Sequence, residues 1–453
     1  MSIEQPGKKQ RKRKLKRDLV RKLRVSQFKP ARMLEPENFQ HFDPWLTSDR
    51  RVVHVLAQNV AASYEIIFPR KRKMKAEDQK NLEVICRTLL SNFAFLIARG
   101  VSAPAITVSL RTPKRKLSRY DRRGFAMLPR LLEALSERGS MVELQKSNQR
   151  GIASSCTLHT GLLADMKRFQ WRQGDFHWDS GAETIVLSIT KRDFARKQKT
   201  IELIDYEETP EATALRAEMS HLNRALREAQ FTFVDDGGPP VITAHRDLIR
   251  HFKIREGEKP RFELGGRIFN GWWQAIPSHR RHAIRINRQP IVDLDISSAF
   301  LRLAYIEAGL SPPEGDLYSR VQRLDAASHR DGIKRIISAM LFRETPLTRI
   351  PSDIGAQLPR GVTGSEVRAA ILSAFPEIAD IFETGIGLRL MFTESQIMMR
   401  ILSGLIDIGI PAMPMHDGIM VQRSAQEVAV KTMTEAAADI TGHRLPITLK
   451  NIS

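Results

Sequence analysis

Residues 291–302 read IVDLDISSAFLR, and this stretch predicts the fold of the C-terminal region of the chain. Its first half alternates, so apolar side chains lie on one face of a strand and Asp293 and Asp295 on the other. After Ser297 the apolar spacing becomes helical. A strand that ends in an acid brings a carboxylate to a sheet edge, and magnesium sites for phosphoryl transfer need such rigid oxygen ligands. The alternative is a helix capped by Asp295 or Ser297.

A basic helix is expected over residues 330–342, which read RDGIKRIISAMLF. Its apolar side chains share one face, and Arg330, Lys334 and Phe342 follow the flank at multiples of four residues. Two cations on successive turns can grip the phosphates of an incoming nucleotide. An aromatic ring two turns later can pack against its base or sugar. The alternative is an ordinary amphipathic helix.

A hairpin is expected over residues 411–423, which read PAMPMHDGIMVQR, after a helix over 395–408. The pair Asp417-Gly418 is a strong signal for a tight turn between two strands. The functional interpretation is a second metal-binding carboxylate, Asp417, at the hairpin tip beside His416. The alternative is a turn with no other role.

In this order, the three segments resemble the motifs of family A DNA polymerases, and the resemblance covers roughly residues 261–453. The first motif of the family has the form Asp-x-Ser-x-x-Glu-Leu-Arg, the second is a spaced Arg, Lys and Tyr, and the third is His-Asp-Glu. The matching positions are Asp295, Ser297, Leu301 and Arg302, then Arg330, Lys334 and Phe342, then His416 and Asp417. Residues 315–318, Gly-Asp-Leu-Tyr, look like the short acidic segment between the first two motifs.

The resemblance implies an α+β fold with a right-hand polymerase palm, an antiparallel sheet and fingers helices. The palm would carry Asp295 and Asp417 as ligands of two Mg²⁺ ions, for which Mn²⁺ is the substitute. The fingers helix would carry Arg330 at the triphosphate and Lys334 at the transferred phosphoryl group.

The remaining positions are implied to contact the substrates. Phe342 and Phe300 would lie at the nucleotide, and His416 and Arg302 at the primer or template. The implied activity is DNA-directed DNA polymerisation, with a DNA primer–template and deoxynucleoside triphosphates as partners.

Three departures from the family pattern affect this expectation. Phe300 replaces a Glu that helps to reject ribonucleotides, Phe342 replaces Tyr, and Gly418 replaces the second acid of the third motif. Single-subunit phage RNA polymerases share the scaffold and also lack that acid, so an RNA polymerase or primase is the alternative. A replication protein that binds DNA without catalysis is another. The motif set resembles divergent polymerase-like proteins of bacterial mobile elements, plasmids and phages.

The rest of the chain is expected to form three further regions. Residues 1–30 carry twelve Lys and Arg against two acids, or +10, and predict a disordered tail that binds phosphates non-specifically; a solvated tail is the alternative. Residues 31–165 predict a mostly helical region, with helices over 81–98 and 121–137 and strands over 105–110 and 140–145. That order is compatible with a DNA-binding winged helix or with a plain helical domain. Residues 166–260 are expected to be a connecting or thumb-like region.

Composition points to a polyanionic partner. The chain has 453 residues, with 72 Lys and Arg against 51 Asp and Glu, which gives a net charge of +21. No run of about 20 apolar residues is found, and no secretory signal, so we expect no membrane partner. With two cysteines, both expected in the core, the predicted location is the cytoplasm, in association with the nucleoid.

Overall fold

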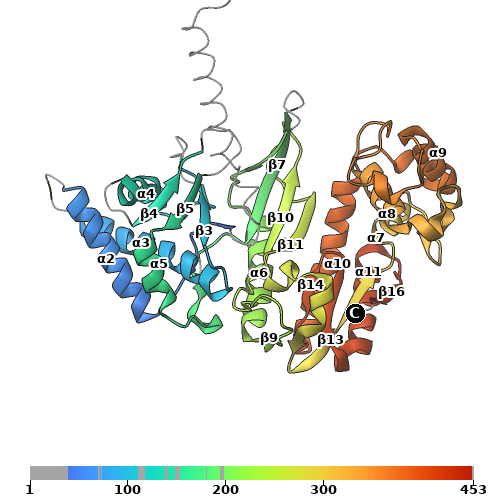
Figure 1. The fold of residues 1–453 in the computed structure, drawn as a ribbon. Coiled ribbons are helices and arrows are strands. Elements are labelled where there is room, and N and C mark those ends of the chain that lie inside the picture. Colours follow the sequence, from blue (N-terminus) through green and yellow to red (C-terminus); the bar gives the residue numbers. More distant parts are fainter. Residues whose placement is uncertain are drawn as a thin grey trace, which may run out of the picture. The chain divides into compact units, whose positions relative to one another are not determined.

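The computed structural model describes residues 39–69, 72, 74–110, 118–137, 141–147, 154–179, 181–193 and 198–450. The predicted basic tail, residues 1–30, lies outside the described residues. The described chain forms two compact units. One contains residues up to Ala182 together with 239–244, and the other contains 183–238 and 245–453. Helices and mainly antiparallel sheets make up both units, in agreement with the expected α+β class at this level (Figure 1).

The first unit packs helices against one four-stranded sheet of order β1-β3-β5-β4. Strand β1 is parallel to β3, and the other pairs are antiparallel. Its principal elements are β1 (Phe39–His41), α2 (Arg51–Ile67), α3 (Ala76–Ala98), β3 (Ala105–Val108), α4 (Leu128–Glu137), β4 (Val142–Gln145), β5 (Ser154–Leu158) and α5 (Thr160–Lys167). The short strands β2 (Leu46–Thr47) and β6 (His177–Trp178) form a separate pair.

The helices and strands expected in this unit are confirmed, although α4 begins seven residues later than predicted. The element order α3, β3, α4, β4, β5 is the one that suggested a winged helix, and DNA binding by this unit stays a prediction. Cys86 and Cys156 both lie in its core, where burial raises the pKa of each thiol to about 12. Within the described residues, α3 alone is long and apolar enough to cross a membrane, and most of its apolar stretch is buried in this core.

The second unit is built on two sheets. The first has the order β11-β10-β7-β8 and the second β14-β15-β13-β12-β9, with β16 added beside β13. The strands are β7 (Ile185–Asp193), β8 (Gln198–Leu203), β9 (Phe231–Phe233), β10 (Ile249–Ile254), β11 (Gly265–Phe269), β12 (Ile284–Ile286), β13 (Gln289–Ile296), β14 (Met413–Met415), β15 (Gly418–Gln422) and β16 (Ile447–Lys450). The helices are α6 (Pro210–Glu228), α7 (Ala299–Glu307), α8 (Ala326–Phe342), α9 (Gly364–Ala374), α10 (Gly387–Asp407) and α11 (Gln426–Thr441).

The division of the chain differs from the expected connecting region over 166–260. Strands β7, β8, β10 and β11 belong to the same unit as the C-terminal sheet. Two arginines join these strands to the C-terminal part of the chain. Arg250 on β10 donates a hydrogen bond to Ser395 of α10, and Arg267 on β11 donates one to Glu394 of the same helix. Figure 1 shows α10 running beside β11 and α11. Helix α10 also begins eight residues before the predicted start.

Candidate active site

Strand β13 brings two predicted acids to one face of the second sheet. It lies between β15 and β16, with Asp295 opposite Gly418 on one side and Thr448 on the other. The backbone N–H of Ile296 donates to the carbonyl of Asp417 over 3.2 Å, which fixes the adjacent turn against the end of β13. The structure therefore places Asp295 and Asp417 side by side, although 122 residues separate them in the chain.

The acid pair is electrostatically unfavourable without a cation. Burial, followed by the charge of Asp417, raises the pKa of Asp295 to about 7. Among the described residues, Oδ1 of Asp295 has no hydrogen-bond partner, although it is fully buried. Neighbouring Asp293 is 3% exposed, and burial raises its pKa as well. Buried carboxylates that repel each other and keep an unsatisfied oxygen are suited to a hard cation.

Lys450 and Arg281 are the cations nearest these acids. The Nζ atom of Lys450 lies 2.8 Å from Oδ2 of Asp295, and Arg281 lies 3.4 Å from Oδ2 of Asp293. Burial lowers the pKa of Lys450, but the nearby carboxylates outweigh it and raise this pKa overall. Sequence reasoning missed Lys450, because nothing in the spacing around residue 450 indicates that β16 pairs with β13.

The hairpin turn is one residue earlier than predicted. Met415 pairs with Gly418, so His416 and Asp417 occupy the turn, and His416 adopts a left-handed φ of 59°. Gly418 instead begins β15, in tight contact with β13. A Cβ atom there would lie 2.4 Å from the carbonyl oxygen of Leu294 and 2.8 Å from Oδ1 of Asp295. An acid at position 418 does not fit this sheet, which is a physical reason for its absence.

His416 is exposed at the turn, beside an aromatic side chain of β11. Its ring centroid lies 6.3 Å from that of Phe269. Phe269 is itself partly exposed, at 37%. The two rings thus form an accessible surface next to the acid pair, which is compatible with the predicted contact to a primer end.

Helix α8 carries the predicted cations on its exposed flank. Arg330 makes a two-pronged ion pair with Asp316, at 2.9 and 3.1 Å, and its guanidinium lies 5.1 Å from the ring centre of Tyr318. Lys334 is exposed, and within the described part of the chain it has no hydrogen bond or ion pair. The charge of Lys334 acts on the buried Glu394. Asp316 belongs to the segment expected between the first two motifs.

The two aromatic replacements pack against each other. The ring centroids of Phe300 and Phe342 are 5.6 Å apart. A Cβ atom added to Gly387, at the start of α10, would lie 2.5 Å from the Phe342 ring, so the glycine makes room for it. The side chains of Phe300 and Phe342 are half-buried, so part of each remains accessible.

Arg302 is placed differently from the predicted primer or template contact. It is 2% exposed, and its guanidinium donates to the backbone carbonyls of Ser297 at 2.8 Å, Gly315 at 2.7 Å, and Pro313. Because all its hydrogen bonds go to backbone, Arg302 holds the loop that leads to Asp316. Arg302 therefore affects the site indirectly, by positioning Asp316, which is the ion-pair partner of Arg330.

Arg267 and Glu394 form an ion pair that sequence reasoning missed. The guanidinium of Arg267 donates to both carboxylate oxygens of Glu394, at 2.6 and 3.0 Å, and lies 5.2 Å from the ring centre of Phe300. Glu394 is 1% exposed, and burial raises its pKa to about 7 against the opposing effect of Arg267. The pair joins β11 to α10, 127 residues apart, and carries no local sequence signal.

The donor set of the acid cluster fits magnesium. All the donors are carboxylate oxygens, and Mg²⁺ is often held by one or two carboxylates while water and substrate phosphates complete its shell. Within the described residues, no group of three or more His, Cys, Asp or Glu side chains has the arrangement of a complete protein-only metal site. Asp295 and Asp417 are thus the residues that would hold the metal, with substrate oxygens as further ligands.

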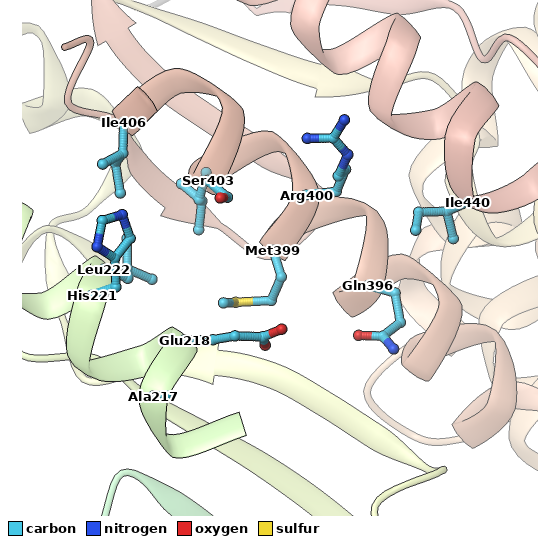
Figure 2. Close-up of a pocket in the computed structure, with 11 residues that line it drawn as sticks. Ala217, Glu218, His221, Leu222, Gln396, Met399, Arg400, Ser403, Ile406 and Ile440 are labelled. Atoms are coloured by element: carbon cyan, nitrogen blue, oxygen red, sulfur yellow. The ribbon is translucent and has the colours of Figure 1, made fainter. Parts of the chain in front are cut away.

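The described cavities lie away from the acids. One of about 520 Å³ opens between α6 and α10, and Figure 2 shows Glu218 and Met399 facing each other across it. It contains none of the predicted site residues. In the first unit, a cavity of about 510 Å³ is bordered by Trp45 and by three arginines, Arg119, Arg122 and Arg123. The guanidinium of Arg122 is already paired with Asp179.

Compared with protein-family models and with curated proteins, the chain matches none.

Proposed function

We propose that the protein is a template-dependent DNA polymerase that transfers nucleotides by a two-metal mechanism. The observation that carries this proposal is the convergence of Asp295, at the end of β13, and Asp417, in the adjacent β14–β15 turn, together with the unsatisfied buried Oδ1 of Asp295. The second support is the exposed cationic flank of α8, formed by Arg330 and Lys334. Acids that hold metal and cations that hold phosphates are the two requirements of phosphoryl transfer.

In this proposal the acids, the cations of α8 and the two exposed rings have different roles. Bound at the two acids, Mg²⁺ supplies activation of the primer 3′-hydroxyl and neutralisation of the leaving pyrophosphate. Lys334 binds the phosphoryl group that is transferred, and Arg330 exchanges Asp316 for the triphosphate. His416 and Phe269 hold the primer end against the turn.

An RNA polymerase or primase is the second candidate. Phe300 and Phe342 provide a packed apolar pair at the place proposed for the sugar. An aromatic ring excludes a 2′-hydroxyl by its bulk, and it offers that hydroxyl no hydrogen bond. The two packed rings are therefore compatible with deoxynucleotides. Separate extension reactions with deoxynucleotides and ribonucleotides distinguish the two candidates.

The test is extension of a labelled DNA primer on a template with Mg²⁺, run separately with deoxynucleotides and ribonucleotides. We expect extension by the wild type, none above background by Asp417→Asn, and wild-type activity by the control Asp380→Asn, whose carboxylate is exposed. Extension with ribonucleotides alone would favour the RNA polymerase. Tight DNA binding without extension by any protein would favour a replication protein that has lost catalysis.

A further inference from the structure

Lys450 lies where a metal ion is expected to act. Strand β16 places it directly opposite Asp293 on β13, on the face that also carries Asp295. Its ammonium reaches diagonally to Oδ2 of Asp295 at 2.8 Å, whereas Oδ1 of that carboxylate has no partner among the described residues. One oxygen of the same carboxylate is thus occupied by a cation of the chain, and the other is open.

The charges around Asp295 explain why a cation of the chain is needed there. Asp293, Asp295 and Asp417 supply three carboxylates, and Lys450 and Arg281 supply two cations. Arg281 lies on the Asp293 side. Without Lys450, Asp295 and Asp417 would repel each other with less compensation, and because Asp295 is largely buried this repulsion would lower the stability of the fold.

We infer that Lys450 is a tethered counter-ion that competes with the divalent metal for Asp295; this inference rests on the proposed function. In the metal-free protein its ammonium balances the acid pair. When the metal binds, the ammonium leaves Oδ2 and stays nearby on its flexible stem. The side chain of Lys450 is 43% exposed, so it has room to move, whereas that of Asp295 is 9% exposed and stays fixed. Lys450 therefore sets the metal concentration at which the site becomes occupied.

Binding of Mn²⁺ alone to the full chain tests this inference, measured by calorimetry without nucleotide or nucleic acid. Lys450→Gln removes the competing charge, and we expect it to bind Mn²⁺ roughly tenfold more tightly than the wild type, since two cations a few ångströms apart repel each other. Lys450→Arg keeps the charge and is expected to bind like the wild type. The control is Lys431→Gln, which removes an exposed lysine on α11 that lies 3.9 Å from Glu435.

The outcomes separate this inference from the proposed function. Equal or weaker Mn²⁺ binding by a folded Lys450→Gln variant, with binding still lost in Asp417→Asn, overturns the counter-ion role and leaves the metal site standing. Tighter binding by Lys450→Gln and by Lys431→Gln alike also overturns it, because the effect would then reflect net charge only. Absence of Mn²⁺ binding from the wild type and every variant overturns the inference and the two-metal proposal together.

Discussion

The two sides of the candidate site are built in opposite ways. On the acid side, Asp295 is 6% exposed and is fixed by strand pairing on both sides of β13. On the cation side, Arg330 and Lys334 project from one exposed helix flank, and Arg330 is held by a partly exposed ion pair with Asp316 and by the ring of Tyr318. One side is rigid and electrostatically strained, and the other is adjustable.

This difference assigns different tasks to the two sides. Rigid, buried acids are costly unless they hold a cation, so they are expected to act on the chemical step. Exposed cations interact weakly with their present partners and are available to a polyphosphate. Substitutions on the acid side should therefore reduce kcat, whereas substitutions on the cation side should mainly raise KM for the nucleotide.

Removing one acid is the largest expected effect. Asp295→Asn should lower nucleotide incorporation by about 10³-fold or more, since loss of metal ligation forfeits several kcal/mol of transition-state stabilisation. Affinity for DNA, measured by fluorescence anisotropy, should change little because the residue supplies no positive charge. Incorporation within tenfold of the wild type would refute the assignment of the acid side.

Crowding the strand contact comes next. Gly418→Ala should lower the free energy of unfolding by about 2–3 kcal/mol, because its Cβ would approach the Leu294 carbonyl oxygen to 2.4 Å. The matched control is Gly355→Ala, where an added Cβ meets no atom within 4 Å. Equal denaturant midpoints for the two variants would mean that the sheet yields easily and that the acid side is not rigid.

Substitution on the cation side should have a smaller effect on rate. Lys334→Ala is expected to lower kcat/KM for the nucleotide about 10- to 100-fold, mostly through KM, as loss of a charged contact to phosphate. Arg335→Ala is the control on the same helix, because the Arg335 side chain is paired with Asp353. If the loss appeared in kcat alone, Lys334 would share the task of the acids and the contrast between the two sides would fail.

The smallest expected effect is a pH dependence of stability on the acid side. The folded pKa of Asp295, about 7, exceeds its unfolded value of 3.8, so the native state binds more protons between these values. Metal-free protein should therefore lose stability as pH rises from about 4 to 7. Urea titrations in EDTA should show a shallower decline for Asp295→Asn. Identical slopes would remove Asp295 as the source.

The main elements of both sides could be predicted because their patterns are local. Alternation in 291–296 indicates β13, and the apolar face of 330–342 indicates α8. Each acid also had a simple alternative, as a cap or as a turn residue. The order of the three motifs favours a site shared by Asp295 and Asp417. The pairing of β13 with β15 places these two acids together.

The contacts that complete the site could not be predicted from spacing. Arg267 meets Glu394 across 127 residues, and Lys450 meets Asp295 across 155. Arg302 was misjudged because its motif position indicates its identity and not the direction of its side chain. The turn was misplaced by one residue, since Asp-Gly favours a turn locally whereas close packing against Leu294 requires the glycine inside the strand.

The position of β13 between two strands that follow it much later has a consequence for how the chain folds. Asp295 pairs with Gly418, 123 residues on, and with Thr448, 153 residues on. Closing loops of that length costs entropy before any pairing is gained, so local helices such as α8, α10 and α11 are expected to form earlier. The acid cluster is then assembled late in folding, and until that moment the part of β13 beyond its first residues, which pair with β12, is an unpaired strand edge exposed to aggregation.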